Sequence, residues 1–193
     1  MDPDGLTFAV ATTAEERLAR RLGFRTVRVG VRAVNGVPGE EPVVSFGLAG
    51  ALRDDLRVGE VLDAVRVVDE RGETLWEGEG LGVEGARAAT ILGSDTLVHD
   101  AAERRRLYAR TGADAVDMES GVLARGGRLA GVVRAISDGA GSAVEGADRT
   151  VHPDGRTNVA GLVRWVATRR GGAIRSMRDA VSALHELERA VAA

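Results

Sequence analysis

Cysteine and lysine are both absent from this chain of 193 residues, so all 26 of its basic residues are arginine. The lack of cysteine excludes a disulfide framework, a thiolate nucleophile and a zinc–thiolate site, and it fits a reducing compartment. The lack of lysine excludes a lysine nucleophile, a Schiff base and the lysine of a Walker-type phosphate loop.

Aromatic residues are also scarce, at 3%, although hydrophobic residues reach 44%. The interior must therefore be built mainly from alanine, valine and leucine, and the 26 glycines predict many tight turns. A length of 193 residues fits one domain, which we place at 1–193.

Long apolar runs and a strong positive charge are missing as well. No run approaches the roughly 18 to 20 residues that span a bilayer, and Asp2 and Asp4 stand where a signal peptide would carry basic residues. The net charge of −3 lacks the electrostatic footprint of a general nucleic-acid binder. We therefore expect a cytoplasmic protein with a small-molecule ligand, no nucleic-acid partner and no transmembrane segment.

Short apolar runs alternate with helical patterns along the chain. A helix start of the capping-box type at 12–16 directly follows the first strand. Strands are expected at 6–11, 26–32, 43–46, 60–68, 90–92, 113–118 and 131–136. Further helices are expected at 99–110, at 119–125 and from residue 157 onward in two segments split by Gly171 and Gly172. This alternation predicts the α/β class, in a single-domain three-layer sandwich whose central mixed sheet is flanked by helices.

Gly80, Gly82 and Gly85 match the G-x-G-x-x-G pattern of dinucleotide-binding loops. However, no convincing strand precedes this segment, no amphipathic helix follows it, and Glu79 and Glu84 would repel a phosphate. We therefore predict a glycine-rich hairpin or loop at this place.

Distinctive motifs follow three of the expected strands, at the sheet edge where open α/β proteins bind ligands. The segment 47–50 is either a ligand cradle or a tight turn. In the segment 117–120, a carboxylate and Met118 could hold a sugar diol and cover its apolar face, or the acidic residues could favour a helix N-terminus. Asp138, which follows Ser137, could act as a general acid or could turn the chain. The residues alone leave these alternatives open.

The remaining ionisable residues show no binding pattern. His99, His152 and His185 share no metal-ligand spacing, so no metal site is expected. The three consecutive arginines at 104–106 are expected to form a solvated helix face.

Taken in order, the three motifs resemble those of the purine nucleoside phosphorylase and methylthioadenosine nucleosidase superfamily: Gly47-Leu48-Ala49-Gly50, Asp117-Met118-Glu119-Ser120 and Arg134-Ala135-Ile136-Ser137-Asp138. Within it, the chain looks most similar to the hopanoid-associated nucleoside phosphorylases, through segments 44–50, 92–95, 111–120 and 154–156. The resemblance implies cleavage of the N-glycosidic bond of an adenine nucleoside such as adenosylhopane. It also implies a homo-oligomer without a cofactor, for which inorganic phosphate is a candidate co-substrate.

For the base end of the substrate, the resemblance implies that Asp138, next to Ser137, protonates or hydrogen-bonds N7 of the leaving purine. It places Ser94 and Asp95 near the base as well. Because cleavage develops negative charge on the base and positive charge on the sugar, a carboxylic acid at the base suits the chemistry.

For the sugar end, the resemblance implies that Glu119 holds the ribose hydroxyls and that Met118 packs against the sugar. Glu15, with Glu16 as the alternative, would lie near the ribose and the attacking water. The residues implied near the ribose or phosphate are Gly47, Leu48, Ala49 and Gly50.

The chain departs from the family pattern at several places. Leu48 stands where many members carry a phosphate- or water-binding serine, and Gly141 interrupts a pattern that normally ends in aspartate. Between residues 32 and 42 there is no room for the helix that normally helps to close the site. Arg28 and Arg32 are candidate phosphate ligands, although exposed strand positions explain them equally well. The acceptor therefore stays open between phosphate and water, and a nucleoside-binding or assembly protein with weakened catalysis is the alternative.

Overall fold

Strands and helices alternate along the chain, as the sequence predicts. The computed structural model describes residues 5–142, 150–161 and 171–192. The strands are β1 (Thr7–Val10), β2 (Arg25–Arg28), β3 (Val43–Ala51), β4 (Val61–Val68), β5 (Thr74–Glu77), β6 (Arg87–Gly93), β7 (Ala115–Asp117) and β8 (Leu129–Asp138). The helices with both ends described are α1 (Thr13–Arg21), α2 (Ala101–Thr111), α3 (Ser120–Arg125) and α5 (Gly171–Ala192), and a 3-10 turn, η1 (Val31–Ala33), follows β2.

All eight strands belong to one mixed sheet, in the order β2-β1-β3-β7-β6-β4-β5, and β8 pairs with both β3 and β4. The pairing of β8 closes β3, β7, β6, β4 and β8 into a ring. Within this ring β3 and β8 run parallel, whereas β3 with β7 and β4 with β8 run antiparallel. The expected mixed sheet is confirmed. That five of its strands close into a ring is not revealed by the sequence pattern of any one strand.

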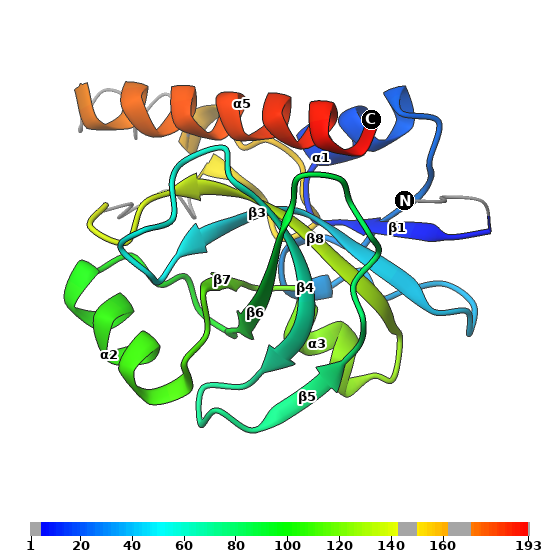
Figure 1. Ribbon diagram of the computed structural model, residues 1–193. Helices are drawn as coiled ribbons and strands as arrows, with labels where there is room; N and C mark the ends of the chain where they lie inside the picture. Colours follow the sequence, from blue (N-terminus) through cyan, green and yellow to red (C-terminus); the bar gives the residue numbers. More distant parts are fainter. Residues whose placement is uncertain (1–4, 143–149, 162–170, 193) are drawn as a thin grey trace.

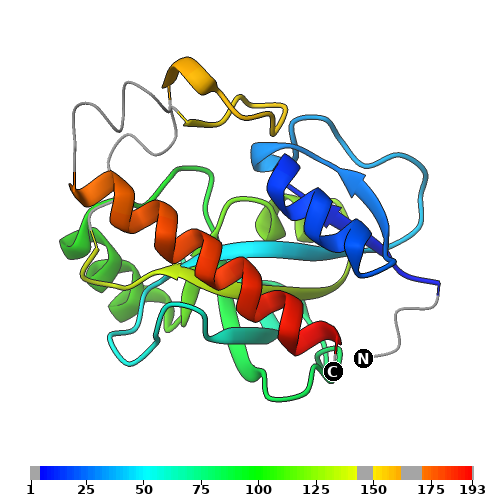
Figure 2. The same ribbon diagram turned by 90° about the horizontal axis from the view of Figure 1, so that it is seen from above.

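Helices cover the sheet on both sides (Figures 1 and 2). The long helix α5 lies across β8, β3 and β4 beside α1, whereas α3 packs against β6, β4 and β5. Beneath α5 and α1, the three phenylalanines of the chain form one cluster. The ring of Phe8 stacks on that of Phe24 at 4.1 Å and meets that of Phe46 edge-on at 5.7 Å. The rest of the core is mainly aliphatic, as the composition predicts. None of the described helices is long and apolar enough to cross a membrane.

Two of the expected strand ends are wrong by four residues or more. β3 does not stop at Phe46 but continues through 47–50 to Ala51, because both of its edges find partners, in β8 and in β7. The resulting ladder outweighs the conformational penalty of two glycines in a strand. In contrast, β2 ends at Arg28, and η1 follows with Arg32 and Ala33 at φ angles of 57° and 51°.

The described residues after 158 are helical, as expected, with two adjustments. Val151 and Thr157 form an isolated β-bridge, and the helix that follows starts at residue 159. Gly171 and Gly172 are the first residues of α5, and residues 162–170 lie outside the described part. Strand β5 was not anticipated from the sequence.

The glycine-rich segment 80–85 is a loop, as predicted, and the structure shows what its amide groups bind. The carboxylate of Asp63, on β4, accepts hydrogen bonds from the backbone N–H of Leu81 at 2.9 Å and of Val83 at 3.1 Å. Asp63 is 7% exposed. These N–H groups therefore hold a carboxylate of the protein itself instead of a dinucleotide phosphate.

Candidate functional site

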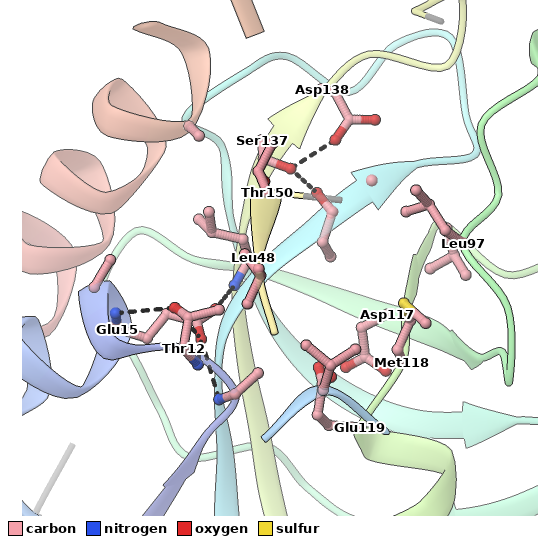
Figure 3. Close-up of a pocket in the computed structure, with 18 of the residues that line it drawn as sticks. Thr12, Glu15, Leu48, Leu97, Asp117, Met118, Glu119, Ser137, Asp138 and Thr150 are labelled. Carbon is pink, nitrogen blue, oxygen red and sulfur yellow. Dashed lines mark hydrogen bonds between the residues drawn. The ribbon is translucent and has the colours of Figure 1, made fainter. Parts of the chain in front are cut away.

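The ends of β3, β7 and β8 meet the start of α1 and one side of α5 around a pocket of about 510 Å³ (Figure 3). Four carboxylates and one guanidinium line it: Glu15, Asp117, Glu119, Asp138 and Arg104. Acidic groups that are 123 residues apart in the sequence thus border one cavity. Among the described residues, no group of three or more histidine, aspartate or glutamate side chains could hold a metal ion.

Glu15 is both part of a helix cap and part of the pocket wall. Thr12 is the N-cap of α1, and Glu15 completes the capping box, with Oε2 accepting from the N–H of Thr12 at 2.8 Å. Its other oxygen, Oε1, accepts from the N–H of Leu48 at 3.0 Å, which ties α1 to the middle of β3. Glu16 points elsewhere and pairs with Arg28 at 3.2 Å. Only the first of these two glutamates therefore lines the pocket.

Glu119 follows β7 and is the residue before α3. Its Oε1 accepts a hydrogen bond from the backbone N–H of Arg32 at 3.1 Å. Arg32 belongs to η1 and has a positive φ angle, so this left-handed backbone supplies a hydrogen-bond donor to Glu119. Met118 lines the same pocket. The position of α3 depends on Gly93 and Gly121, because a Cβ on Gly121 would lie 2.9 Å from the Cα of Gly93. This close packing brings the start of α3 against the end of β6.

Arg134, on β8, is the centre of a buried polar network beneath Glu119. Its guanidinium lies 2.6 Å from Asp117 Oδ2, donates to Ser45 Oγ at 2.6 Å and lies 3.7 Å from Glu119 Oε2. Ser120 Oγ also donates to the carboxylate of Asp117. The motif that contains Arg134 did not by itself reveal this role, although an arginine within an apolar strand signals a buried acidic partner.

The electrostatics of this network act on Glu119. Burial raises the pKa of Glu119 to about 8, and Asp117 and Glu15 add to the shift, whereas Arg134 opposes it. Burial alone would lower the pKa of Arg134, but Asp117, Glu119 and Glu15 together raise it. Arg134 therefore stays charged, and Glu119 holds a proton readily near neutral pH.

Ser137 and Asp138 form the opposite end of the pocket, at the end of β8. Ser137 Oγ contacts the carbonyl oxygen of Ala49 at 3.2 Å and donates to Asp138 Oδ1 at 2.6 Å. Asp138 Oδ2 forms an ion pair with Arg104 at 2.5 Å. The expectation that residues 104–106 all face solvent is wrong for Arg104, which is 1% exposed because its side chain turns inward from α2 to these groups.

The other expected site residues differ in their positions. Leu48, Ala49 and Gly50 line the pocket; Gly47 does not, but a Cβ there would lie 2.8 Å from Arg134 Nη1. Ser94 is buried, and its hydroxyl donates to Glu70 at 2.9 Å. Asp95 pairs with Arg125 and lines a second cavity of about 510 Å³. That Ser94 and Asp95 act near the base stays a prediction.

The second cavity adjoins the first, because the two share lining residues. The residues that line both are Val31, Thr96, Leu97, Met118 and Val151. Arg32 lines only the second cavity, at the place where the chain is too short for the expected helix.

A turn at 150–157 forms one side of both cavities. The backbone N–H of Thr13 donates to Gly155 O, and the N–H of Val31 donates to Pro153 O, each at 3.0 Å. These bonds attach the turn to the loops after β1 and β2. Helix α5 contributes an apolar wall to the first pocket, consisting of Met177, Ala180, Val181 and Leu184.

Comparisons with known proteins agree with this architecture. The family model of the phosphorylase superfamily matches residues 82–167. No curated protein sequence matches the chain. Among solved structures, the chain resembles the futalosine hydrolase of Helicobacter pylori, with 16% identity over 94% of this chain and 97% of that chain and a TM-score of 0.57.

Two nucleosidase structures give the same result. The 5′-methylthioadenosine/S-adenosylhomocysteine nucleosidase of Helicobacter pylori has 16% identity, with 94% of this chain and 97% of that chain covered and a TM-score of 0.57. The corresponding enzyme of Streptococcus pneumoniae, bound to a transition-state inhibitor, has 14% identity, with 94% and 99% covered and a TM-score of 0.59. The chain thus has the fold of these nucleosidases, and its residues 82–167 match the phosphorylase superfamily.

Proposed function

We propose that this protein cleaves the N-glycosidic bond of an adenine nucleoside, with water as the acceptor. The observation that carries the proposal is the convergence of Glu15, Glu119 and Asp138, from three distant parts of the chain, on one pocket. The proposal also agrees with the nucleosidase and hydrolase activities named for structures of the same fold.

The arrangement suits the charge changes of the reaction. As the bond between C1′ and N9 breaks, the sugar becomes positive and the base becomes negative. Glu119 and Met118 would hold the ribose, and a water that attacks C1′ would give its proton to Glu15. Asp138, supported by Ser137, would donate a proton to N7 of the departing adenine, and the proton that Glu15 takes from the water balances the one that Asp138 gives up.

The charges of the pocket favour water over phosphate. The described walls carry four carboxylates and only one guanidinium, that of Arg104, which already pairs with Asp138. Arg28, a candidate phosphate ligand, donates instead to Thr13 at 3.1 Å and to Glu16 at 3.2 Å. A phosphate dianion would be repelled by these four carboxylates, whereas a water molecule needs only an acceptor for its proton.

The apolar wall on α5 supports a hydrophobic 5′ substituent on the nucleoside. Val181 is 67% exposed although it borders the pocket, and Met177 and Leu184 lie beside it. An alkyl or polycyclic group such as hopane would cover these side chains, whereas the 5′ hydroxyl of plain adenosine would leave them in water. Burial of apolar surface is favourable by about 25 cal/mol per Å².

Product analysis tests the proposal. We would incubate the protein with adenosine, methylthioadenosine and a nucleoside that carries a long alkyl group at the 5′ position, each with and without phosphate. We expect free adenine and the free sugar in both conditions, with the alkyl substrate cleaved best. A sugar 1-phosphate would overturn the choice of water, and tight nucleoside binding without adenine release would favour the alternative, a nucleoside-binding protein with weakened catalysis.

A further inference from the structure

Helix α2 directs a single side chain into the base end of the pocket. Arg104 is 1% exposed, and all three of its guanidinium nitrogens are engaged. Nε and Nη2 donate to the carbonyl oxygen of Val98 at 3.1 and 2.9 Å, and Nη1 donates to the carbonyl oxygens of Gly139 at 3.1 Å and Ala51 at 3.3 Å. The guanidinium thus joins the end of β3, the end of β8 and the loop before α2.

This guanidinium also holds one oxygen of Asp138. Nη2 lies 2.5 Å from Oδ2, and that oxygen is buried without a hydrogen bond from the described residues. Gly50 allows the approach, because a Cβ there would lie 3.1 Å from Oδ2 and 3.2 Å from Nη1 and Nη2 of Arg104. With Oδ2 covered, Oδ1 on the Ser137 side is the oxygen left to meet a ligand.

We propose that Arg104 is the positioning residue of the reaction at the base: it fixes Oδ2 of Asp138 and thereby presents Oδ1 to N7 of the purine. This inference rests on the proposed function. The backbone carbonyls fix the guanidinium itself, since a planar group with several bonds in one orientation has little freedom to move. Arg104 therefore acts through Asp138 and does not bind a substrate anion.

A merely structural role for Arg104 predicts a different pattern of effects. Loss of a purely structural contact would lower activity by the same factor whether or not residue 138 carries a carboxylate. Loss of a positioning residue matters only while Asp138 is present, so the two substitutions should be strongly non-additive.

A double-mutant cycle separates the two roles. Arg104→Met is combined with Asp138→Asn, and kcat and KM for adenine release are measured for all four proteins. We expect Arg104→Met alone to lower kcat by about 10-fold or more with a smaller change in KM, and to have less than about a twofold effect in the Asp138→Asn background. Arg104→Lys, which keeps the charge, should recover part of the loss. Arg106→Met, at an exposed position of the same helix, is the control.

Adenine affinity, measured by calorimetry on the same proteins, extends the cycle to variants that are too slow to assay. Equal losses in both backgrounds, in kcat and in adenine affinity, would overturn the inference. If Arg104→Met does not fold, the same cycle with Arg104→Lys decides. A folded unaltered protein that neither binds nor releases adenine would instead contradict the proposed function, so the two failures are distinguishable.

Discussion

Individual side chains divide the pocket into two chemically different ends. Glu119 lies over the Arg134 network, where burial favours its neutral form, whereas Asp138 has a guanidinium in direct contact. The two carboxyl groups thus lie in different environments, which is a common way for a protein to give two such groups different roles.

The contact of Asp138 with the base gives the most direct test of a single residue. We expect Asp138→Asn to lower the rate of adenine release by about 10² to 10⁴, the usual contribution of a proton-transferring group. Asp54→Asn, at an exposed position, is the matched control and should leave the rate unchanged. A variant at position 138 that retains full turnover would exclude Asp138 from the reaction.

Glu119 makes the stability of the fold depend on pH. Burial raises its pKa to about 8 from an ordinary value of 4.5, so between these values the unfolded chain has lost a proton that the folded protein keeps. The contribution of Glu119 to stability is therefore full below about pH 4.5 and is lost as the pH rises through about 8. The slope from this one group is at most about 1.4 kcal/mol per pH unit.

Denaturant unfolding between pH 5 and 9 measures this slope. Glu119→Gln should flatten the pH dependence and should unfold at higher denaturant concentration than the unaltered protein above pH 8. Glu84→Gln, an exposed control, should leave the slope as it is. An unchanged slope in Glu119→Gln would contradict the raised pKa.

Among the secondary-structure elements, α3 depends on its contact with β6. Gly121→Ala would place a Cβ 2.9 Å from the Cα of Gly93, and backbone atoms cannot yield as a side chain can. We expect a loss of about 1 to 3 kcal/mol in the free energy of unfolding, together with a raised KM because Glu119 moves with α3. Gly126→Ala, whose Cβ would meet only ordinary contacts from 3.5 Å, should be much milder in both measurements.

The elements also show how far sequence patterns reach. The helix start of the capping-box type at 12–16 and the position of Asp138 at a strand end were predictable from local patterns, whereas a role for Glu119 was implied by the family resemblance. The burial of Arg104 and Arg134 was not, because each depends on acidic and carbonyl partners far away in the chain. The extension of β3 through Gly47 and Gly50 likewise follows from pairing on both edges, which no single segment encodes.

In the whole molecule, the residues proposed to bind the 5′ group and those proposed to cleave the bond belong to different elements. The carboxylates come from α1, from β7 and β8 and from the residue before α3, whereas the apolar wall belongs to α5. Val181→Asp should therefore raise KM for a nucleoside with a long 5′ alkyl group by about 10-fold and leave that for adenosine unchanged. Ser182→Asp adds the same charge at a neighbouring exposed position and is the control. Equal effects on both substrates would argue against α5 as the 5′ wall.

A closed ring of five strands supports the reacting groups, and it consists of β3, β7, β6, β4 and β8. Each of its strands has a partner on both sides, so the gap between the strands that lead to Glu119 and to Asp138 cannot widen without breaking a ladder. Backbone amides of this ring should exchange with deuterium more slowly than any others of the chain, and those of α5 should exchange much faster. Residues of α5 could thus be replaced to accept new substrates while the spacing between Glu119 and Asp138 is kept.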